Sequence, residues 1–411
     1  MKLLVGSVMV LSALADLPRS LGVGSFSALG FITVFFILLA LITWVSSGLF
    51  APRVGLIALF LGLFFAWGGV SFVWYEPTIP GIQNLLVVAA FVLLILAVSD
   101  RAYFSPGLPW YAGRMLSWST ALAGAAYAVS VVLDGPGAGS ILSARAFSLF
   151  AMTGLAWSLA AWRYRSGRWF WVAAALAILV VISLSRLAMI TALLMFPLAW
   201  FSPRSAKGWI RTALVISLVG GLFYFAATRF EPLHDRFFES GPSQPIHVGR
   251  LEVTGTGRAS FWPAAWDSFL ESPWIGKGAG SSGQLISQLF PGNDHPHNDY
   301  LRVLHDYGSL GLLLWVLGFL TLAGRIWAAW ARADRAGEGE AQLHLAAFLG
   351  LVGLALGMIA NNPFVYVFVM CPIAVVAGAS LGRIHGLPEH QVTDERSRTR
   401  KPLVIVPQAF G

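Results

Sequence analysis

Residues 169–201 read WFWVAAALAILVVISLSRLAMITALLMFPLAWF, a run of 33 residues with Arg186 as its only charged member. Basic residues flank the run on both sides: Arg163, Arg165 and Arg168 before it, and Arg204, Lys207 and Arg211 after it. Because short cytoplasmic loops carry an excess of Lys and Arg, both ends of the run are predicted to be cytoplasmic. The run must then cross a membrane twice, since about 20 apolar residues suffice for one crossing.

We place the turn between the two crossings at residues 183–186, which puts Arg186 at the external mouth of the pair. A charged side chain at such a depth is costly unless it meets a partner or an anion, so Arg186 is interpreted as functional. The alternative is an arginine that extends to the interface and only anchors the turn.

Composition supports a membrane protein along the whole chain of 411 residues. Hydrophobic residues make up 57 % and charged residues 11 %, and the mean hydropathy is +0.72. These values exclude the soluble classes and indicate a polytopic membrane protein. In such a protein the net charge of +8 reflects the orientation of the chain across the membrane and does not indicate a nucleic-acid partner. Cys371, the only cysteine, leaves no intrachain disulfide and no cysteine-based metal site.

The predicted fold is an all-α polytopic membrane protein with about twelve transmembrane helices and one large external loop containing short helices. The predicted spans are residues 2–15, 27–47, 54–74, 82–98, 116–133, 145–162, 169–185, 187–201, 209–227, 309–328, 342–361 and 364–382. With both termini cytoplasmic, 18 of the 27 Lys and Arg fall in the inside loops and tail. The chain divides into helices one to nine (1–227), the loop subdomain (228–308), helices ten to twelve (309–383) and a cytoplasmic tail (384–411).

Two segments of the loop have recognisable patterns. Arg258, after a glycine, opens a helix-like stripe of aromatic and small residues that Pro273 ends, which predicts a helix packed on the membrane domain or lying in the interface. Residues 276–283 read GKGAGSSG, which lacks the spacing of a nucleotide-binding P-loop. We interpret them as a flexible turn, with a backbone site for phosphate as the alternative.

The stretch 294–308, DHPHNDYLRVLHDYG, is the most polar part of the chain and directly precedes an apolar run. Asp294 is a plausible N-cap, with Pro296 in the first turn, so a short amphipathic helix is predicted to begin here. His297 would share a face with Leu301 and Leu304.

In that helix Asp299, Arg302 and Asp306 take the opposite face. The dipole at the helix start would disfavour the protonated form of His297, which makes the neutral imidazole a candidate general base. His305 would orient His297 or face solvent beside Asp306.

A metal site is the first alternative for this stretch. His295 and His297 offer two imidazoles, but a catalytic zinc needs a third protein ligand, and only Asp294, Asp299 or His305 lie near in sequence. The second alternative is an external loop with capping residues and no chemistry.

The predicted topology places Arg145, Arg186, Arg258 and His297 on the outer side of the membrane. Arginine presents a rigid, permanently charged fork that suits phosphate oxygens. Three such residues near one bilayer face favour a bound lipid pyrophosphate, stabilised as a leaving group without a metal. The histidine would then take a proton from an attacking hydroxyl. For Arg145, an ordinary interfacial arginine is the alternative.

These residues resemble a known family. His297-Asn298-Asp299-Tyr300-Leu301, with the glycines at 308 and 311, is similar to the HN-x-x-L…G-x-x-G signature of the bacterial O-antigen ligase and O-antigen polymerase superfamily. Ser185-Arg186 resembles that family's Ser-Arg at an external turn, and Gly257-Arg258 resembles its second loop arginine. Arg145 is a weaker match. The motifs cover about residues 180–315.

The resemblance implies an integral-membrane glycosyltransferase of the GT-C type in the bacterial inner membrane, with its active site facing the periplasm. It would move a glycan from undecaprenyl pyrophosphate to an acceptor hydroxyl on lipid A-core (a ligase) or on a lipid-linked glycan (a polymerase). In this picture His297 is the base and the arginines bind pyrophosphate. Asn298, Asp299, His295 and His305 are possible supporting residues, and the reaction is inverting and needs no metal or other cofactor.

The main rival is a transporter or flippase for a lipid-linked oligosaccharide. It would spread its arginines through a central cavity, whereas here they gather on one face and no inverted repeat is seen, so we favour the enzyme. A non-catalytic assembly protein is the third class. The sequence leaves the choice between ligase and polymerase open.

Overall fold

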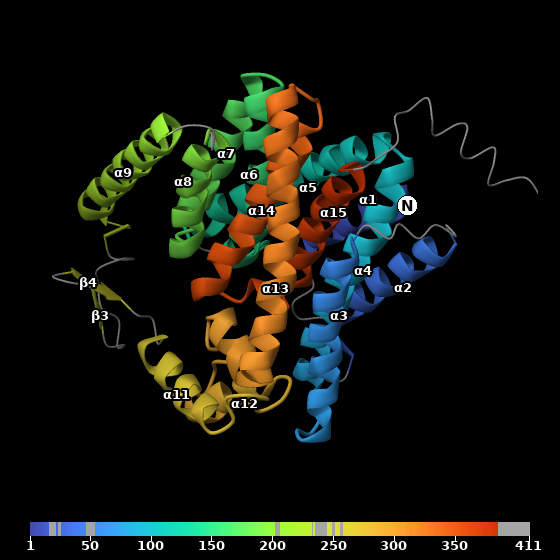
Figure 1. The fold of residues 1–411 in the computed structure, drawn as a ribbon. Coiled ribbons are helices and arrows are strands. Elements are labelled where there is room, and N and C mark those ends of the chain that lie inside the picture. Colours follow the sequence, from blue (N-terminus) through green and yellow to red (C-terminus); the bar gives the residue numbers. More distant parts are fainter. Residues whose placement is uncertain are drawn as a thin grey trace, which may run out of the picture.

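The computed structural model of the chain is a bundle of helices in which segments far apart in sequence lie side by side (Figure 1). The structure describes residues 1–15, 22–23, 26–46, 54–137, 139–201, 206–231, 233–234, 245–248, 251–254 and 258–384. The predicted cytoplasmic tail lies outside the described residues, apart from Ile384.

The first part of the chain forms α1 (Lys2–Leu14), α2 (Ala28–Val45), α3 (Gly55–Val70), α4 (Ile79–Phe104), α5 (Gly107–Asp134), α6 (Ala144–Tyr164), α7 (Arg168–Ile182), α8 (Arg186–Ala199) and α9 (Ala206–Arg229). The rest forms α11 (Arg258–Leu270), α12 (Ser281–Leu289), α13 (Asp299–Ala336), α14 (Ala341–Ala360) and α15 (Val367–Arg383). Short 3-10 turns lie at Ser71–Val73 and Pro363–Val365.

The fold is all-helical apart from two short hairpins, which the sequence did not indicate. Strand β1 (Gly22–Val23) pairs with β2 (Phe26–Ser27), and β3 (Pro245–Val248) pairs with β4 (Leu251–Thr254), both antiparallel. Each hairpin is isolated, so neither forms a larger sheet among the described residues.

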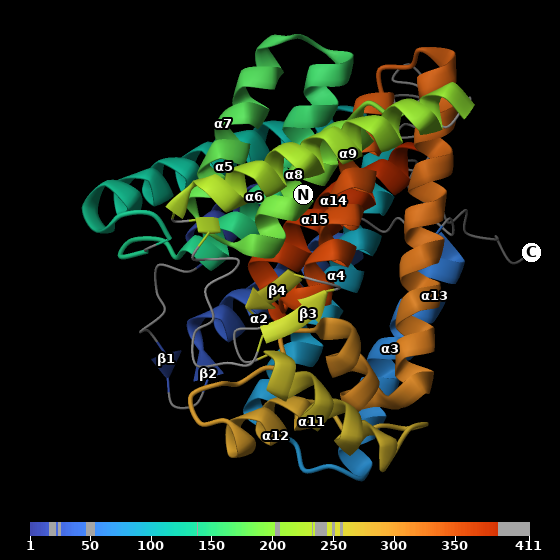
Figure 2. The same cartoon turned by 90° about the vertical axis from the view of Figure 1, so that its left-hand side faces the viewer.

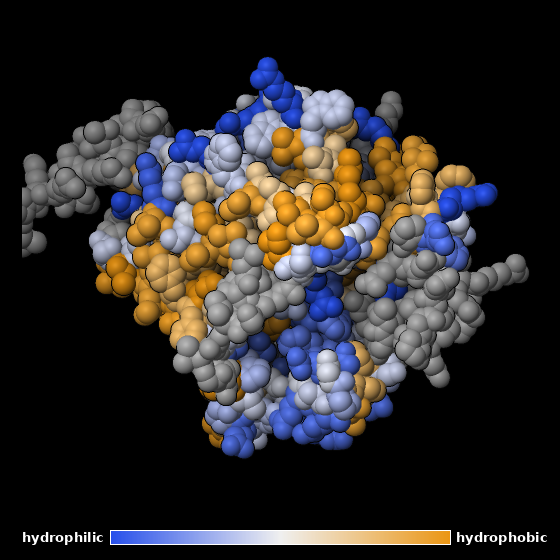
Figure 3. All heavy atoms as spheres, turned by 180° about the vertical axis from the view of Figure 1, so that it is seen from behind, coloured by the Kyte–Doolittle hydropathy of each residue, from blue (hydrophilic) through white to orange (hydrophobic). Residues whose placement is uncertain are grey.

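Eight of the described helices are long and apolar enough to cross a membrane, namely α2, α3, α4, α5, α6, α9, α13 and α14. Four shorter apolar helices, α1, α7, α8 and α15, complete the set of apolar segments predicted from the sequence. Figure 3 shows hydrophobic side chains gathered around the middle of the molecule, with hydrophilic side chains toward both ends. A multi-span membrane protein is therefore confirmed, while the count of twelve crossings stays a prediction.

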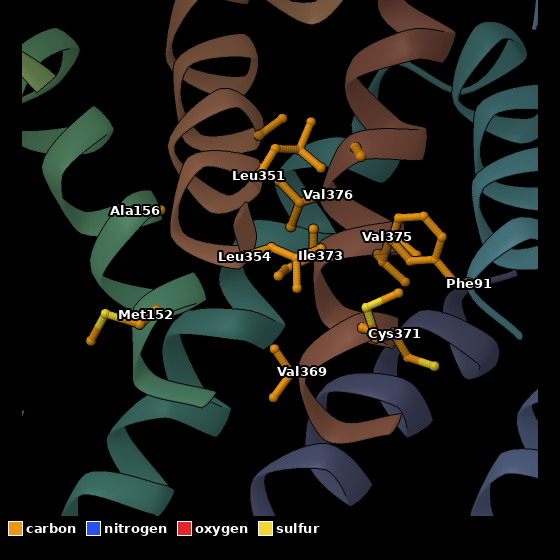
Figure 4. Close-up of a cluster of buried hydrophobic side chains, with 14 of the residues drawn as sticks. Phe91, Met152, Ala156, Leu351, Leu354, Val369, Cys371, Ile373, Val375 and Val376 are labelled. Carbon is orange, nitrogen blue, oxygen red and sulfur yellow. The ribbon is translucent and has the colours of Figure 1, made fainter. Parts of the chain in front are cut away.

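The core lies where α4, α6, α14 and α15 meet. Figure 4 shows side chains from these helices, among them Phe91, Met152, Leu354 and Cys371, gathered in the buried interior. Every residue of α15 from Val367 to Gly382 is buried, so this helix is surrounded by protein. A helix inside the bundle needs no full membrane-spanning length, which accounts for its 17 residues.

Small residues let α15 approach α4 closely. A Cβ placed on Gly378 would lie 2.9 Å from the carbonyl oxygen of Ile95, and one on Gly382 would lie 2.3 Å from that of Ser99. Such distances exclude any larger side chain. Small residues at helix contacts are a common way for membrane helices to pack without a hydrophobic driving force.

One end of the bundle is tied together by Arg163 at the end of α6. Its guanidinium pairs with Asp334 of α13 at 3.0 Å and donates to the carbonyl oxygens of Ala199 and Phe201, at the end of α8. We call this the Arg163 end. Since α6 begins at Ala144 and α8 begins at Arg186, their first residues lie toward the opposite end, which we call the His297 end.

Helices α11 and α12 lie at the His297 end, which is at the bottom of Figure 1, below the long upper part of α13. Figure 2 shows α9 lying across the outside of α8 and away from this end. The turn predicted at residues 183–186 is confirmed, because α7 ends at Ile182 and α8 begins at Arg186. Leu184 in that turn has a positive φ of 51°.

Helix α13 is broken once, at Gly308. This residue has φ 69° and ψ −175°, so the chain leaves the helical conformation for one residue between two helical segments. Carbonyl oxygens of a neighbouring loop take up the amides that the break releases: Ser309 donates to Pro273 and Leu310 to Trp274. A Cβ at Gly308 would lie 2.3 Å from the Trp274 oxygen, so the break requires glycine.

The predicted helix start at Asp294 is wrong. Helix α13 begins at Asp299 with Asn298 as its N-cap, whose side-chain oxygen accepts a 3.0 Å hydrogen bond from the amide of Leu301. Asn caps helices about as well as Asp, so the local signal did not separate the two residues. His297 therefore precedes the helix, and the face it was predicted to share with Leu301 does not exist.

Candidate functional site

His297 is held at the junction between the 290–298 segment and α13. Its backbone adopts the left-handed conformation, with φ 55°, which is strained for a residue with a Cβ. The imidazole Nδ1 lies 3.0 Å from the Nδ2 atom of Asn362, in the connection between α14 and α15. On its other side the ring stacks over Phe261 of α11, with centroids 6.5 Å apart. Backbone strain at a polar residue with such fixed neighbours is typical of functional sites.

The orientation of the Asn362 amide decides which nitrogen of His297 carries the proton. With Nδ2 facing Nδ1, the imidazole accepts there and its proton sits on Nε2. The Oδ1 atom of Asn362 is buried and has no hydrogen-bond partner among the described residues. A 180° rotation of the amide would bring Oδ1 against an Nδ1–H group and leave the lone pair on Nε2. The rotated amide fits a histidine that accepts protons.

The four polar residues of the first turns of α13 are all buried, which corrects the prediction of an amphipathic helix. Asp299, Arg302, His305 and Asp306 expose 2 % or less of their surface. The loop before α12 and the turn after α14 cover them, so the face opposite Leu301 meets protein.

Asp306 closes the glycine-rich loop onto α13. Its carboxylate accepts hydrogen bonds from the amides of Gly280 and Ser282, at 3.1 and 2.8 Å, and from the Ser281 hydroxyl at 3.1 Å. These donors lie at the start of α12, where a negative charge is favourable. The loop is therefore ordered by an internal anion, and two of the amides that were considered for a phosphate donate to this carboxylate instead.

His305 joins the same cluster. Its Nδ1 lies 3.2 Å from both the Ser281 hydroxyl and the Asp306 carboxylate, and its Nε2 lies 3.1 Å from the Ser268 hydroxyl of α11. The prediction that His305 faces solvent is wrong. Asn362, and not His305, is the side chain hydrogen-bonded to His297.

Asp299 and Arg302 form a second buried group nearby. One Asp299 oxygen accepts from the amide of Phe364 at 2.8 Å, and the other lies 3.5 Å from Arg302 Nε. At that distance the ion pair is loose, and neither Nε nor Nη2 of Arg302 has a hydrogen-bond partner among the described residues. The guanidinium thus keeps unused donors although it is almost fully buried.

A cavity of about 470 Å³ opens beside Arg302. It lies between α2, α4, α12 and the 294–302 segment, and it is lined by Arg302, His295, Asp294 and Gln83 together with several Ser, Thr and Asn side chains. Neither Arg186 nor His297 lines it. The cavity is therefore a neighbour of the His297 position and not the same space.

His295 is held in the neutral form. Burial lowers the pKa of His295 well below the usual 6.5, and the positive charge of Arg302 lowers it further. Its Nδ1 is buried without a partner among the described residues. Arg145 itself lies in the first turn of α6 with its side chain exposed.

The other two predicted arginines stand at helix starts. Arg186 is the first residue of α8 and is half-buried, and Arg258 is the first residue of α11. The side chain of Arg258 lies outside the described part of the chain. The structure thus puts Arg145 and Arg186 in the first turns of α6 and α8, and leaves the distance from Arg258 to His297 undescribed.

A metal site finds no support within the residues described, because no group of three or more His, Cys, Asp or Glu side chains is placed to hold an ion. His295 and His297 sit in one segment, but within the described residues they are not part of such a group. Metal-free chemistry is a separate prediction, to be tested by experiment.

Arg302, Asn362 and Gln83 were not predicted as site residues from the sequence. A signal existed for Arg302, because acidic and basic residues three apart at a helix start often pair, as Asp299 and Arg302 do. For Asn362 the signal was a pair of amides between two apolar runs, at 361–362. For Gln83 there was no sequence signal, since a glutamine near the start of an apolar helix is common.

Comparison with protein families finds one match over part of the chain. Residues 171–316 match the family described as Wzy_C, O-antigen ligase. The matched part runs from α7 through the His297 segment to the middle of α13, and it includes Arg186, Arg258 and His297 but not Arg145. A comparison with curated proteins gives no match. The predicted resemblance to the O-antigen ligase and polymerase superfamily is therefore confirmed over these residues.

Proposed function

We propose that this protein is a glycosyltransferase that uses a lipid-pyrophosphate-linked glycan donor, because residues 171–316 match the family described as O-antigen ligase. The donor is undecaprenyl pyrophosphate carrying a glycan, and the acceptor is a hydroxyl of lipid A-core or of another lipid-linked glycan. The protein works in the bacterial inner membrane, with both termini cytoplasmic and the site facing the periplasm.

The chemistry we propose is a single displacement at the anomeric carbon. The acceptor hydroxyl attacks that carbon while the bond from the carbon to the pyrophosphate oxygen breaks, which inverts the configuration. The hydroxyl proton passes to Nε2 of His297, with Nδ1–H held by the Asn362 amide in its rotated orientation. The products are the new glycoside and undecaprenyl pyrophosphate.

The arginines of the His297 end would stabilise the leaving group. Each of these arginines stands where a helix begins, so a positive charge and a helix start coincide: Arg186 is the first residue of α8, Arg258 the first of α11 and Arg145 the second of α6. Both features favour an anion. With arginines in this role, no divalent cation is required.

The observation that carries the proposal is the position of His297. The family's His-Asn motif sits at a strained, half-buried junction where the imidazole is oriented by Asn362 and flanked by Phe261. A histidine that served only to cap a helix or face solvent would not be expected in such surroundings.

The test is transfer by the purified protein in nanodiscs, with lipid-linked donor and excess EDTA. We expect Arg186→Ala and Arg258→Ala each to abolish transfer, and Arg→Lys at either position to impair it, because an ammonium cannot form the bidentate fork. Arg332→Ala, at an exposed arginine of α13 near the Arg163 end, is the matched control and should stay active. Full activity of both alanine variants at 186 and 258 would overturn the pyrophosphate assignment, and loss of activity in EDTA that zinc restores would revive a metal site.

A further inference from the structure

The cavity beside Arg302 has the size and lining of a ligand site. Its volume of about 470 Å³ falls within the range of roughly 300–1,000 Å³ that small-molecule sites occupy. It lies at the His297 end, since its walls include Ser27 before α2, Thr78 before α4 and the first turns of α12.

Three polar groups of the cavity wall have unused hydrogen-bonding capacity. Arg302 is 2 % exposed, and its Nε and Nη2 donate to no oxygen among the described residues. The Nε2 atom of Gln83 on α4 is likewise buried and unpartnered, as is Nδ1 of His295. An unsatisfied buried polar group costs about 1–3 kcal/mol, so three of them around one cavity call for a ligand that satisfies them.

The charge of the lining argues against a phosphate or pyrophosphate group. Arg302 is the one permanent cation on the wall, and it already shares its charge with Asp299. Asp294 contributes a carboxylate, and His295 is neutral. A pyrophosphate would bring at least two negative charges to a wall with almost no net charge.

Neutral hydroxyl and amide groups make up most of the remaining polar wall, among them Thr33, Gln83, Asn84 and Ser282. Such groups both donate and accept, which is what the ring hydroxyls of a sugar require. A guanidinium with free donors adds a strong partner for a hydroxyl or a single carboxylate.

We propose that this cavity binds one sugar residue of the glycan substrate, with Arg302 and Gln83 donating to its hydroxyl or carboxylate oxygens. The inference rests on the proposed function, because only a glycan substrate would bring a sugar to this end of the bundle. The sugar belongs to the donor or to the acceptor, and both sources present the same chemistry to the wall.

The test is saturation-transfer difference NMR on the full chain in nanodiscs, with methyl β-glucoside and methyl β-glucuronide as probes. We expect transfer to the ring protons of at least one probe in the wild type. Gln83→Met should weaken binding about five- to tenfold, the loss that removal of one hydrogen bond to a ligand produces. Arg302→Gln should weaken it further.

Two matched controls make the result specific. Gln342→Met makes the same replacement at a glutamine whose side-chain nitrogen and oxygen are also buried and unpartnered, but which lines a different cavity, together with Arg165. His297→Ala removes the proposed base without touching the cavity wall. Both variants should bind the probes as the wild type does.

Thermal unfolding separates a binding role of Gln83 from a structural one. Gln83→Met removes one exposed hydrogen bond, which the Oε1 atom accepts from the Ser27 hydroxyl at 3.3 Å, and also removes the buried Nε2 that has no partner among the described residues. Because these two effects oppose each other, the melting temperature should change little. A large fall in the melting temperature, probe binding that is equal in the wild type and in Gln83→Met, or no binding to the wild type would each overturn the proposal. Probe binding by NMR does not depend on catalysis. A wild type that binds the probes but shows no activity in the transfer assay would therefore contradict the proposed function and leave the sugar site standing.

The transfer assay then identifies the source of the sugar. A rise in KM for the lipid-linked donor in Gln83→Met assigns the sugar to the donor, and a rise in KM for the acceptor assigns it to the acceptor. Unchanged values of KM for both substrates, despite weaker probe binding, would overturn the assignment to a glycan substrate.

Discussion

The two halves of the 294–308 stretch differ in how their buried polar groups are satisfied. In the second half, Asp306 accepts from three donors and His305 has a neighbour for each ring nitrogen. In the first half, His295, Asp299 and Arg302 all retain buried polar atoms without a partner among the described residues. The two halves are separated by a single turn of α13.

This difference assigns the halves to different tasks. A fully satisfied buried network stabilises one arrangement of its elements, so the half around Asp306 holds α11, α12 and α13 together. Unsatisfied groups lower stability, so several of them gathered in one short segment indicate a place where a ligand or a reaction uses them. We therefore expect the half from His295 to Arg302 to contact the substrate, and experiments on stability and on turnover should separate the two.

The largest effect is expected for Asp306→Ala. Removal of the carboxylate leaves three donors at the start of α12 without their acceptor, and each buried donor left unsatisfied costs about 1–3 kcal/mol. The matched control is Asp294→Ala, in the same stretch but exposed, which should change the free energy of unfolding by less than about 0.5 kcal/mol. The measurement is unfolding of both purified variants in detergent, and equal stabilities would remove the distinction between the two halves.

The next effect is on turnover, through Asn362. Asn362→Ala takes away the side chain that orients His297, and misplacement of a catalytic group by about 1 Å costs up to about 10²-fold in rate. We expect turnover to fall by about 10- to 100-fold with donor affinity unchanged. Asn361→Ala, at the neighbouring amide, is the control.

The conservative variant Asn362→Asp tests the direction of the hydrogen bond. A carboxylate accepts from Nδ1–H and leaves the Nε2 lone pair available, so this variant should retain more activity than Asn362→Ala. It should also move the pH–rate profile, because a nearby negative charge favours the protonated imidazole. Lower activity for the aspartate variant than for the alanine variant would instead favour Asn362 as the donor to Nδ1.

The smallest effect is the acid sensitivity that His295 contributes. Because burial and nearby positive charges hold its pKa in the folded protein well below 6.5, the unfolded chain takes up a proton in acid that the folded chain does not. Stability is therefore unaffected by His295 above about pH 6.5 and decreases as the pH falls from 6.5 toward the lowered pKa, by at most about 1.4 kcal/mol per pH unit.

Melting temperatures between pH 5 and pH 8 check this expectation against His295→Gln, which cannot titrate in that range. The wild type should lose more stability than the variant below pH 6.5, and the two curves should run parallel above it. Parallel curves over the whole range would mean that His295 is not held neutral in the folded protein.

The sequence predicted the helices well, because an apolar run is a local property of the chain. The turn at residues 183–186 and the helix that begins at Arg258 could be placed from short patterns alone. The helix of α13 was predicted too, but it begins at Asp299, because Asn298 and not Asp294 provides the cap. That choice is supported by a contact 65 residues away, where the Asp299 carboxylate accepts from Phe364.

The environment of the site could be predicted only in part. The match over residues 171–316 includes His297 and Arg186, which the sequence motifs had indicated, while their placement on the outer side of a membrane stays a prediction. The burial of Asp306 and His305 could not be foreseen, because it depends on a loop about 25 residues earlier folding back onto α13. The cavity beside Arg302 is similarly assembled from α2, α4 and α12, which no local pattern brings together.

His297 as the proton acceptor is the central assignment in the proposed reaction. The most direct test measures both turnover and donor affinity for the purified wild type and for His297→Ala. We predict that turnover falls by about 10²–10⁴-fold, the usual contribution of a general base, while the Kd for the lipid-linked donor stays within about twofold because the arginines bind it. Turnover by His297→Ala close to that of the wild type, or an equal loss in His295→Ala, would contradict the assignment.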